Sequence, residues 1–154
     1  MSRRETVDLQ FAHSPDRLVA LYTDPAFLVA EAEMLGALET TVREVFRSDE
    51  LLELVVDQRT PNRNPFSTAK EVRQSLRYEW DLADRSCRWT RTAEGEKGVS
   101  IVGTHRAVQA GEGCRYTLSW DLTVSLPLVG GKLEKMLGEG VVKAAREREA
   151  FAAR

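Results

Sequence analysis

Residues 114–125 read CRYTLSWDLTVS, and their alternation decides the fold. Every second side chain from Cys114 to Val124 is apolar or aromatic, and the side chains between them are polar or charged. This period of two is typical of a β-strand with one face buried and the other face in solvent. We therefore predict a long strand whose buried face carries Cys114, Tyr116, Leu118, Trp120, Leu122 and Val124.

The predicted strand leads into a long helix. Pro127 cannot continue a β-ladder, and Gly130-Gly131 permit a sharp reversal before the chain restarts at Lys132. Residues 132–151 have helical spacing, with one apolar side made by Leu133, Met136, Leu137, Val141, Ala144 and Ala145. About 20 residues of helix span roughly 30 Å, which is enough to cross a small sheet. We predict that the sheet wraps around this helix.

Two glycines, Gly138 and Gly140, lie inside the predicted helix. A glycine in a helix interior lowers helix stability by about 1 kcal/mol relative to alanine. We therefore expect a compensating reason, either close packing of the helix on the sheet or room for a ligand beside it.

The chain begins with one strand and two short helices. Residues 4–12 alternate between apolar and polar side chains, as expected for a half-buried strand. Ser14-Pro15 and Asp24-Pro25 each combine a helix N-cap with proline at the first helical position. Gly36 is expected to end the second of these helices as its C-cap.

Period-two alternation recurs in five further segments. Short polar turns join these segments, so we expect neighbouring strands to pair as antiparallel hairpins. The segments are residues 37–46, 51–60, 76–82, 87–90 and 99–110. The complete order is one strand, two short helices, six strands and a terminal helix, which indicates the α+β class.

The composition indicates a folded protein without affinity for nucleic acid. The chain has 154 residues, of which 42% are hydrophobic and 30% charged. This length and hydrophobic content are enough to form one buried core. Its 22 Lys and Arg are balanced by 24 Asp and Glu, so it lacks the basic field that DNA or RNA requires. The N-terminus lacks the apolar core of a signal peptide, and no apolar run could span a membrane. We expect a single domain over residues 1–154, cytoplasmic and without an integral membrane segment.

This order of elements resembles the START-like superfamily, also called the SRPBCC, polyketide cyclase or Bet v-like group. The junction from Trp120–Val124 into Pro127–Glu134 is also similar to an uncharacterised family, domain of unknown function family 2505. The resemblance implies a helix-grip fold: a curved, seven-stranded antiparallel sheet in the order 1-7-6-5-4-3-2, with the C-terminal helix packed across it. Cys87 and Cys114 would then lie two strands apart, too far for a disulfide, so we expect buried free thiols.

The same resemblance implies an apolar ligand cavity between the sheet and the helix. The three tryptophans fall on apolar strand faces, where they either line the bottom of this cavity or only pack in the core. The predicted lining residues are Val42, Trp80, Trp89, His105, Tyr116, Leu118, Trp120, Leu133, Met136, Leu137 and Val141.

Few polar side chains are candidates for chemistry in this cavity. His13 is expected at an exposed strand end. The period of two places His105 on the concave face of the sheet, where it is either a ligand contact or a structural histidine. Glu44 shares a predicted face with apolar residues, so either a bulge turns it outward or its carboxylate is paired or has a raised pKa. The arginines at 85, 88 and 91 and at 146, 148 and 154 are expected in solvent.

No motif of a cofactor-dependent or hydrolytic enzyme is present. The sequence has no glycine-rich phosphate loop, no HExxH and no GxSxG, and its two cysteines are not in CxxC spacing. We therefore predict no metal, no cofactor and no catalytic residues.

We predict a noncatalytic protein that binds or carries a small hydrophobic molecule, such as a lipid, a sterol-like or a polyketide-like compound. One alternative is a cyclase or aromatase-type enzyme of the same superfamily, in which His105, Tyr116 or Glu44 orients a reactive ligand. Another is a protein-interaction module whose core is filled by its own side chains. The sequence specifies neither the ligand nor the oligomeric state.

Overall fold

A computed structural model describes residues 2–62, 68–96, 98–125 and 130–153, without the side chains of Ser2 and Leu133. Ten helices and strands follow the predicted order in these residues. They are β1 (Ser2–Phe11), α1 (Pro15–Tyr22), α2 (Pro25–Met34), β2 (Glu39–Arg47), β3 (Leu51–Pro61), β4 (Glu71–Asp81), β5 (Ser86–Ala93), β6 (Val99–Ala110), β7 (Gly113–Val124) and α3 (Gly130–Ala152). Strand β4 begins five residues before the predicted segment at 76.

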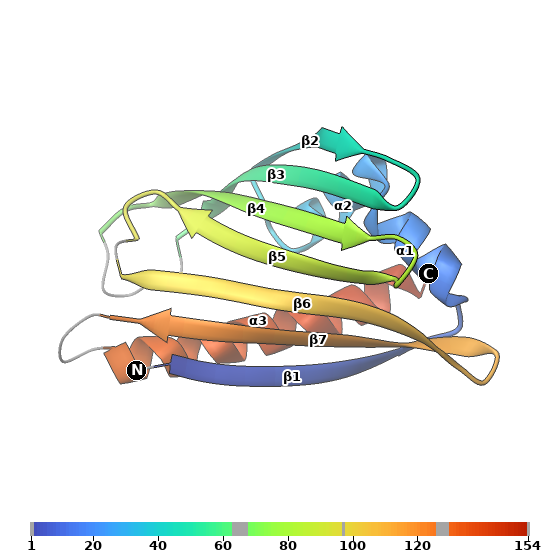
Figure 1. The fold of residues 1–154 in the computed structure, drawn as a ribbon. Coiled ribbons are helices and arrows are strands. Elements are labelled where there is room, and N and C mark those ends of the chain that lie inside the picture. Colours follow the sequence, from blue (N-terminus) through green and yellow to red (C-terminus); the bar gives the residue numbers. More distant parts are fainter. Residues whose placement is uncertain (1, 63–67, 97, 126–129, 154) are drawn as a thin grey trace.

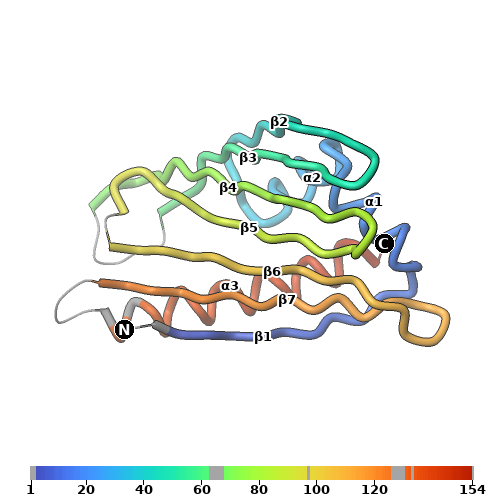
Figure 2. The backbone as a smooth tube through the Cα atoms, in the orientation of Figure 1, coloured from blue at the N-terminus to red at the C-terminus, as the bar shows by residue number. Residues whose placement is uncertain are grey.

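The strands form one antiparallel sheet in the order β1-β7-β6-β5-β4-β3-β2, as predicted. Figure 1 shows this sheet curving around α3, while α1 and α2 lie near the C-terminal end of α3. Figure 2 traces the N-terminus of β1 beside the first turns of α3 and the C-terminus beside α1. The fold therefore has a concave face turned toward the helices and a convex face turned away from them.

The proline signatures mark where the two short helices begin. The Ser14 side chain accepts a hydrogen bond from the Arg17 backbone N–H, and Asp24 accepts one from Ala26. These bonds satisfy backbone donors that a helix N-terminus leaves without partners. After α2, Gly36 has a φ of 99°, a left-handed conformation that glycine adopts without strain. Both N-cap predictions are confirmed; the C-cap itself is Leu35, and Gly36 is the residue that follows it.

Helix α3 begins at Gly130, two residues earlier than predicted, so Gly130-Gly131 form its first turn. Pro127 lies outside the described residues. The last turns of α3 are tied to β1: the Gln10 backbone N–H donates to Glu149, and His13 Nε2 donates to the Ala152 carbonyl oxygen over 2.7 Å. His13 is therefore not the exposed strand-end residue expected from the sequence, but a half-buried cap on a helix C-terminus.

Strand β2 contains the irregularity expected near Glu44, but in a different place. The pairing with β3 shifts between Glu44 and Phe46, so it is Phe46 that changes face and lies opposite Glu53. Glu44 stays opposite Leu54, at the open edge of the sheet, where it is exposed and paired with Arg47. The bulge therefore does not turn Glu44 outward; the edge position of β2 exposes it.

The alternation of β7 gives the centre of the core. Trp120, Tyr116 and Leu122 are each at most 1% exposed, and they belong to a core cluster that also includes apolar side chains of β1, β3 and β6. Cys87 and Cys114 are buried free thiols, as predicted. None of the helices in the described residues has the length and apolar character needed to cross a membrane.

Candidate functional site

A cavity of about 450 Å³ lies between the concave face of the sheet and α3. This volume is within the usual range for small-molecule sites. Much of its wall is apolar or aromatic and comes from four strands and α3, namely Leu76, Tyr78, Trp89, Ile101, Leu118, Trp120, Met136, Leu137, Val141, Ala144 and Ala145. Another side is formed where α2 turns into β2, by Ala32, Leu35, Gly36 and Ala37.

The placement of the helices explains why a cavity forms. Helix α3 packs against β1 and β7, while α2 packs beside β2 at the opposite edge of the sheet. Between these two helices lie the concave faces of β3 to β6. The cavity lies over these strand faces. A strongly curved sheet and one straight helix thus enclose space that side chains only partly fill.

Seven of the predicted lining residues do line this cavity: Trp89, His105, Leu118, Trp120, Met136, Leu137 and Val141. Three others lie elsewhere in the core. Trp80 and Tyr116 are fully buried, and Val42 packs against the core from β2. The side chain of Leu133 lies outside the described residues. That any of these side chains contacts a ligand remains a prediction.

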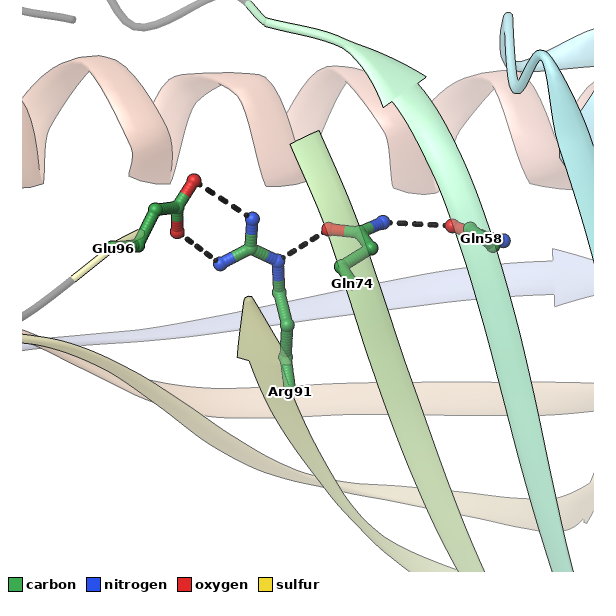
Figure 3. Close-up of polar contacts among 4 residues, drawn as sticks. All are labelled: Gln58, Gln74, Arg91 and Glu96. Carbon is green, nitrogen blue, oxygen red and sulfur yellow. Dashed lines mark hydrogen bonds and ion pairs between the residues drawn. The ribbon is translucent and has the colours of Figure 1, made fainter. Parts of the chain in front are cut away.

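A polar network crosses the cavity wall on β3, β4 and β5 (Figure 3). The Arg91 guanidinium forms two ion-pair hydrogen bonds with Glu96, of 2.8 and 3.2 Å, and its Nε donates to Gln74 over 2.6 Å. The Gln74 amide in turn donates to Gln58 over 2.7 Å. Every nitrogen of the Arg91 guanidinium therefore has an acceptor within the protein, and the Arg91 charge is balanced by Glu96.

A second ion pair joins α3 to α2 near the C-terminal end of α3. Arg148 Nε lies 3.1 Å from Glu31 Oε1, and the Glu31 side chain is 6% exposed. Burial raises the pKa of Glu31, against the opposing effects of Arg148 and of a hydrogen bond from Tyr22. Arg148 also lines the cavity. Arg91 and Arg148 are therefore not the solvated surface charges expected from the sequence, whereas Arg88 and Arg146 are exposed as predicted. Arg154 lies outside the described residues.

His105 lies on the concave face, as the alternation of β6 predicts, and is 4% exposed. Its Nδ1 is 2.8 Å from the Tyr116 hydroxyl, and Tyr116 stacks on Tyr22. The rings of Trp89 and Tyr78 lie close by, at 5.8 and 6.1 Å between centroids. Burial, with a smaller contribution from the Arg148 charge, lowers the pKa of His105 to about 3. The imidazole is therefore neutral at physiological pH.

The two helix glycines have different surroundings. A Cβ at Gly138 would lie 3.3 Å from Nε of Arg3 on β1, so this glycine permits close packing. Gly140 instead lines the cavity, and no described atom lies within 4 Å of the position that a Cβ would take there. Close packing thus explains Gly138, while room for a ligand beside Gly140 stays a prediction.

Gly103 on β6 and Gly140 on α3 should respond in opposite ways to alanine. At Gly103, a Cβ would lie 2.5 Å from Cε2 of Trp89 and 2.6 Å from the Ser119 carbonyl oxygen. Gly103→Ala should therefore lower the free energy of unfolding by roughly 1–3 kcal/mol. Gly140→Ala should raise it by about 1 kcal/mol, because alanine favours a helix and meets open space. Urea denaturation measures both, and equal effects would contradict these surroundings.

A second hollow, of about 490 Å³, lies over β2 to β5 and is lined mainly by polar and charged side chains. Arg59 is paired there with Glu39 and Glu71 at well-exposed positions. Solvent screens exposed charges, so their interactions, including those with a ligand in this hollow, are weak. The cavity beneath α3 is therefore the stronger candidate site.

The fold and cavity place the chain in a class of known structures, the helix-grip proteins. It is similar to the Zhui aromatase/cyclase from Streptomyces sp. R1128, with a TM-score of 0.67 and 16% identity over 97% of this chain and 90% of that chain. Norcoclaurine synthase from Thalictrum flavum, in complex with dopamine and hydroxybenzaldehyde, has a TM-score of 0.68 and 16% identity over 99% and 87%. TTHA0849 from Thermus thermophilus has a TM-score of 0.62 and 20% identity over 99% and 100%. At these identities the similarity establishes the fold.

Within this class, the chain belongs to the family described as protein of unknown function (DUF2505), whose profile matches residues 6–154. This confirms the resemblance seen at the junction between the last strand and the helix. A comparison with proteins of curated function found no match.

Proposed function

We propose that this protein binds or carries a small hydrophobic molecule in the cavity between the sheet and α3. The observation that carries the proposal is the cavity itself, of about 450 Å³, with a largely apolar and aromatic wall. The charges in its wall are already paired, Arg91 with Glu96 and Arg148 with Glu31. An uncharged ligand can therefore enter without leaving a buried charge unpaired.

An enzyme of the cyclase or aromatase type remains the alternative, since one structural neighbour is an aromatase/cyclase. Of the three polar groups considered for that role, only His105 lines the cavity. An imidazole with a pKa of about 3 is a weak general base at neutral pH. Substituting His105 would abolish turnover in an enzyme, but would change the affinity of a carrier only modestly. The open cavity lends no support to an interaction module with a filled core.

Native mass spectrometry tests the proposed function. The purified protein is incubated with a mixture of apolar ring compounds and lipids, and its native mass is compared with its denatured mass. We expect a defined adduct in the native spectrum that disappears on unfolding, because the cavity exists only in the folded state. If the native and denatured masses agree after every incubation, the proposal is wrong. A cytoplasmic location remains a prediction from the sequence.

A further inference from the structure

The end of the cavity near the C-terminus of α3 differs from the end that holds the Arg91 network. Tyr78, His105 and Arg148 line the cavity there, and we call them the donor cluster. Within the described parts of the chain, no residue forms a hydrogen bond with His105 Nε2, with the Tyr78 hydroxyl or with the two terminal nitrogens of Arg148. None of these atoms is sealed inside the core without a partner. They are therefore open to the cavity.

The hydrogen bond to Tyr116 sets the tautomer of His105. The buried Tyr116 hydroxyl has no other partner in the described residues, so its O–H must donate to Nδ1 to avoid an unsatisfied buried donor. A neutral imidazole that accepts at Nδ1 carries its hydrogen on Nε2. His105 therefore presents an N–H donor to the cavity, beside the Tyr78 O–H and the Arg148 N–H groups.

The charge of the donor cluster is already balanced. Glu31 neutralises Arg148 from the side of α2, and it does not itself line the cavity. A ligand carboxylate at this end would add a second negative charge beside a buried carboxylate, which is unfavourable. A carbonyl oxygen accepts hydrogen bonds without adding net charge, and its two lone pairs match several converging donors.

We propose that the donor cluster is a subsite for the carbonyl oxygen of an otherwise apolar, ring-containing ligand. This rests on the proposed function, because it specifies which ligand the cavity prefers and how that ligand is oriented. The ring system lies against Trp89, Leu118 and the apolar side of α3, and the carbonyl points toward Tyr78, His105 and Arg148.

Equilibrium dialysis with fluorenone and fluorene tests the subsite, because the two probes have nearly the same shape and differ by one carbonyl oxygen. We expect fluorenone to bind roughly tenfold more tightly than fluorene, the gain expected from one or two net hydrogen bonds. Fluorene carboxylate should bind more weakly than fluorenone. Tyr78→Phe, which removes only a hydroxyl, should weaken fluorenone roughly threefold to tenfold and change fluorene by less than about twofold.

Tyr116→Phe tests the tautomer of His105 separately, since it removes the hydroxyl that donates to Nδ1 but does not itself line the cavity. It should reduce the preference for fluorenone less than Tyr78→Phe does. Equal binding of fluorenone and fluorene to the wild type would overturn the subsite and leave the proposed function standing. Tighter binding of the carboxylate would also overturn it. If neither fluorenone nor fluorene binds, the proposed function fails together with the subsite.

Discussion

Arg148→Met should lower the free energy of unfolding by about 3 kcal/mol at neutral pH, because it leaves the Glu31 carboxylate buried without its cation. The Glu31 side chain is 6% exposed, and Arg148 is its ion-pair partner, 3.1 Å away. Methionine fills a similar volume, so the loss reports mainly on charge rather than on a cavity. Urea denaturation of the variant and the wild type measures the difference.

The dependence on pH separates this explanation from a loss of packing. Burial raises the pKa of Glu31 in the folded state above its ordinary value of 4.5, and removing Arg148 raises it further. A carboxyl group whose pKa is raised in the folded state binds its proton more tightly there than in the unfolded state. The loss of folding stability caused by its buried charge therefore develops as the pH rises through the pKa of the folded state. The deficit of Arg148→Met should therefore shrink as the pH falls toward about 4.5.

The double variant Glu31→Gln/Arg148→Met removes both charges and is the matched control. It should recover much of the stability that Arg148→Met loses. A deficit that is the same at all pH values, with no recovery in the double variant, would contradict a buried ion pair between α2 and α3.

Acid should destabilise the wild type through His105. The folded pKa of about 3 lies below the ordinary value of 6.5, so the unfolded chain binds a proton more readily between these values. The stability that the neutral imidazole contributes is complete above pH 6.5 and is lost as the pH falls toward 3. At pH about 4.5 the loss should be about 2–3 kcal/mol.

The test compares urea denaturation of wild type and His105→Gln at neutral pH and at about pH 4.5. Glutamine does not titrate, so this variant should lose about 2–3 kcal/mol less than the wild type on acidification. Identical pH responses of wild type and His105→Gln would show that His105 is not held neutral by burial.

The order of elements could be predicted because each is encoded locally. The alternation of residues 114–125, the Ser14-Pro15 and Asp24-Pro25 caps and the turns between strands depend only on near neighbours in sequence. The long terminal helix was also visible from its spacing, although its first turn includes Gly130-Gly131. A bulge in β2 was expected, but that it turns Phe46 rather than Glu44 could not be predicted, because a register shift depends on the partner strand as much as on β2 itself.

The part of the site that lies on the strands could be predicted from the period-two alternation, which assigns each side chain to one face of the sheet. Trp89 and His105 were found in this way, and Arg91 was available by the same rule, since it lies two residues after Trp89 on β5. Treating Arg91 as a surface charge ignored that period. Arg148 and Glu31 were not predictable, because they come from α3 and α2 and meet only when both helices pack on the sheet.

The most direct test of a ligand cavity is to fill it and measure binding. Leu137→Trp/Val141→Trp places two indoles one helical turn apart on the cavity side of α3. Leu51→Trp/Val108→Trp makes the same substitutions at two exposed strand positions. Equilibrium dialysis with fluorene should give binding at least roughly tenfold weaker for the cavity pair and within about twofold of wild type for the surface pair. Equal fluorene affinity in all three proteins would mean that the ligand does not bind between the sheet and α3.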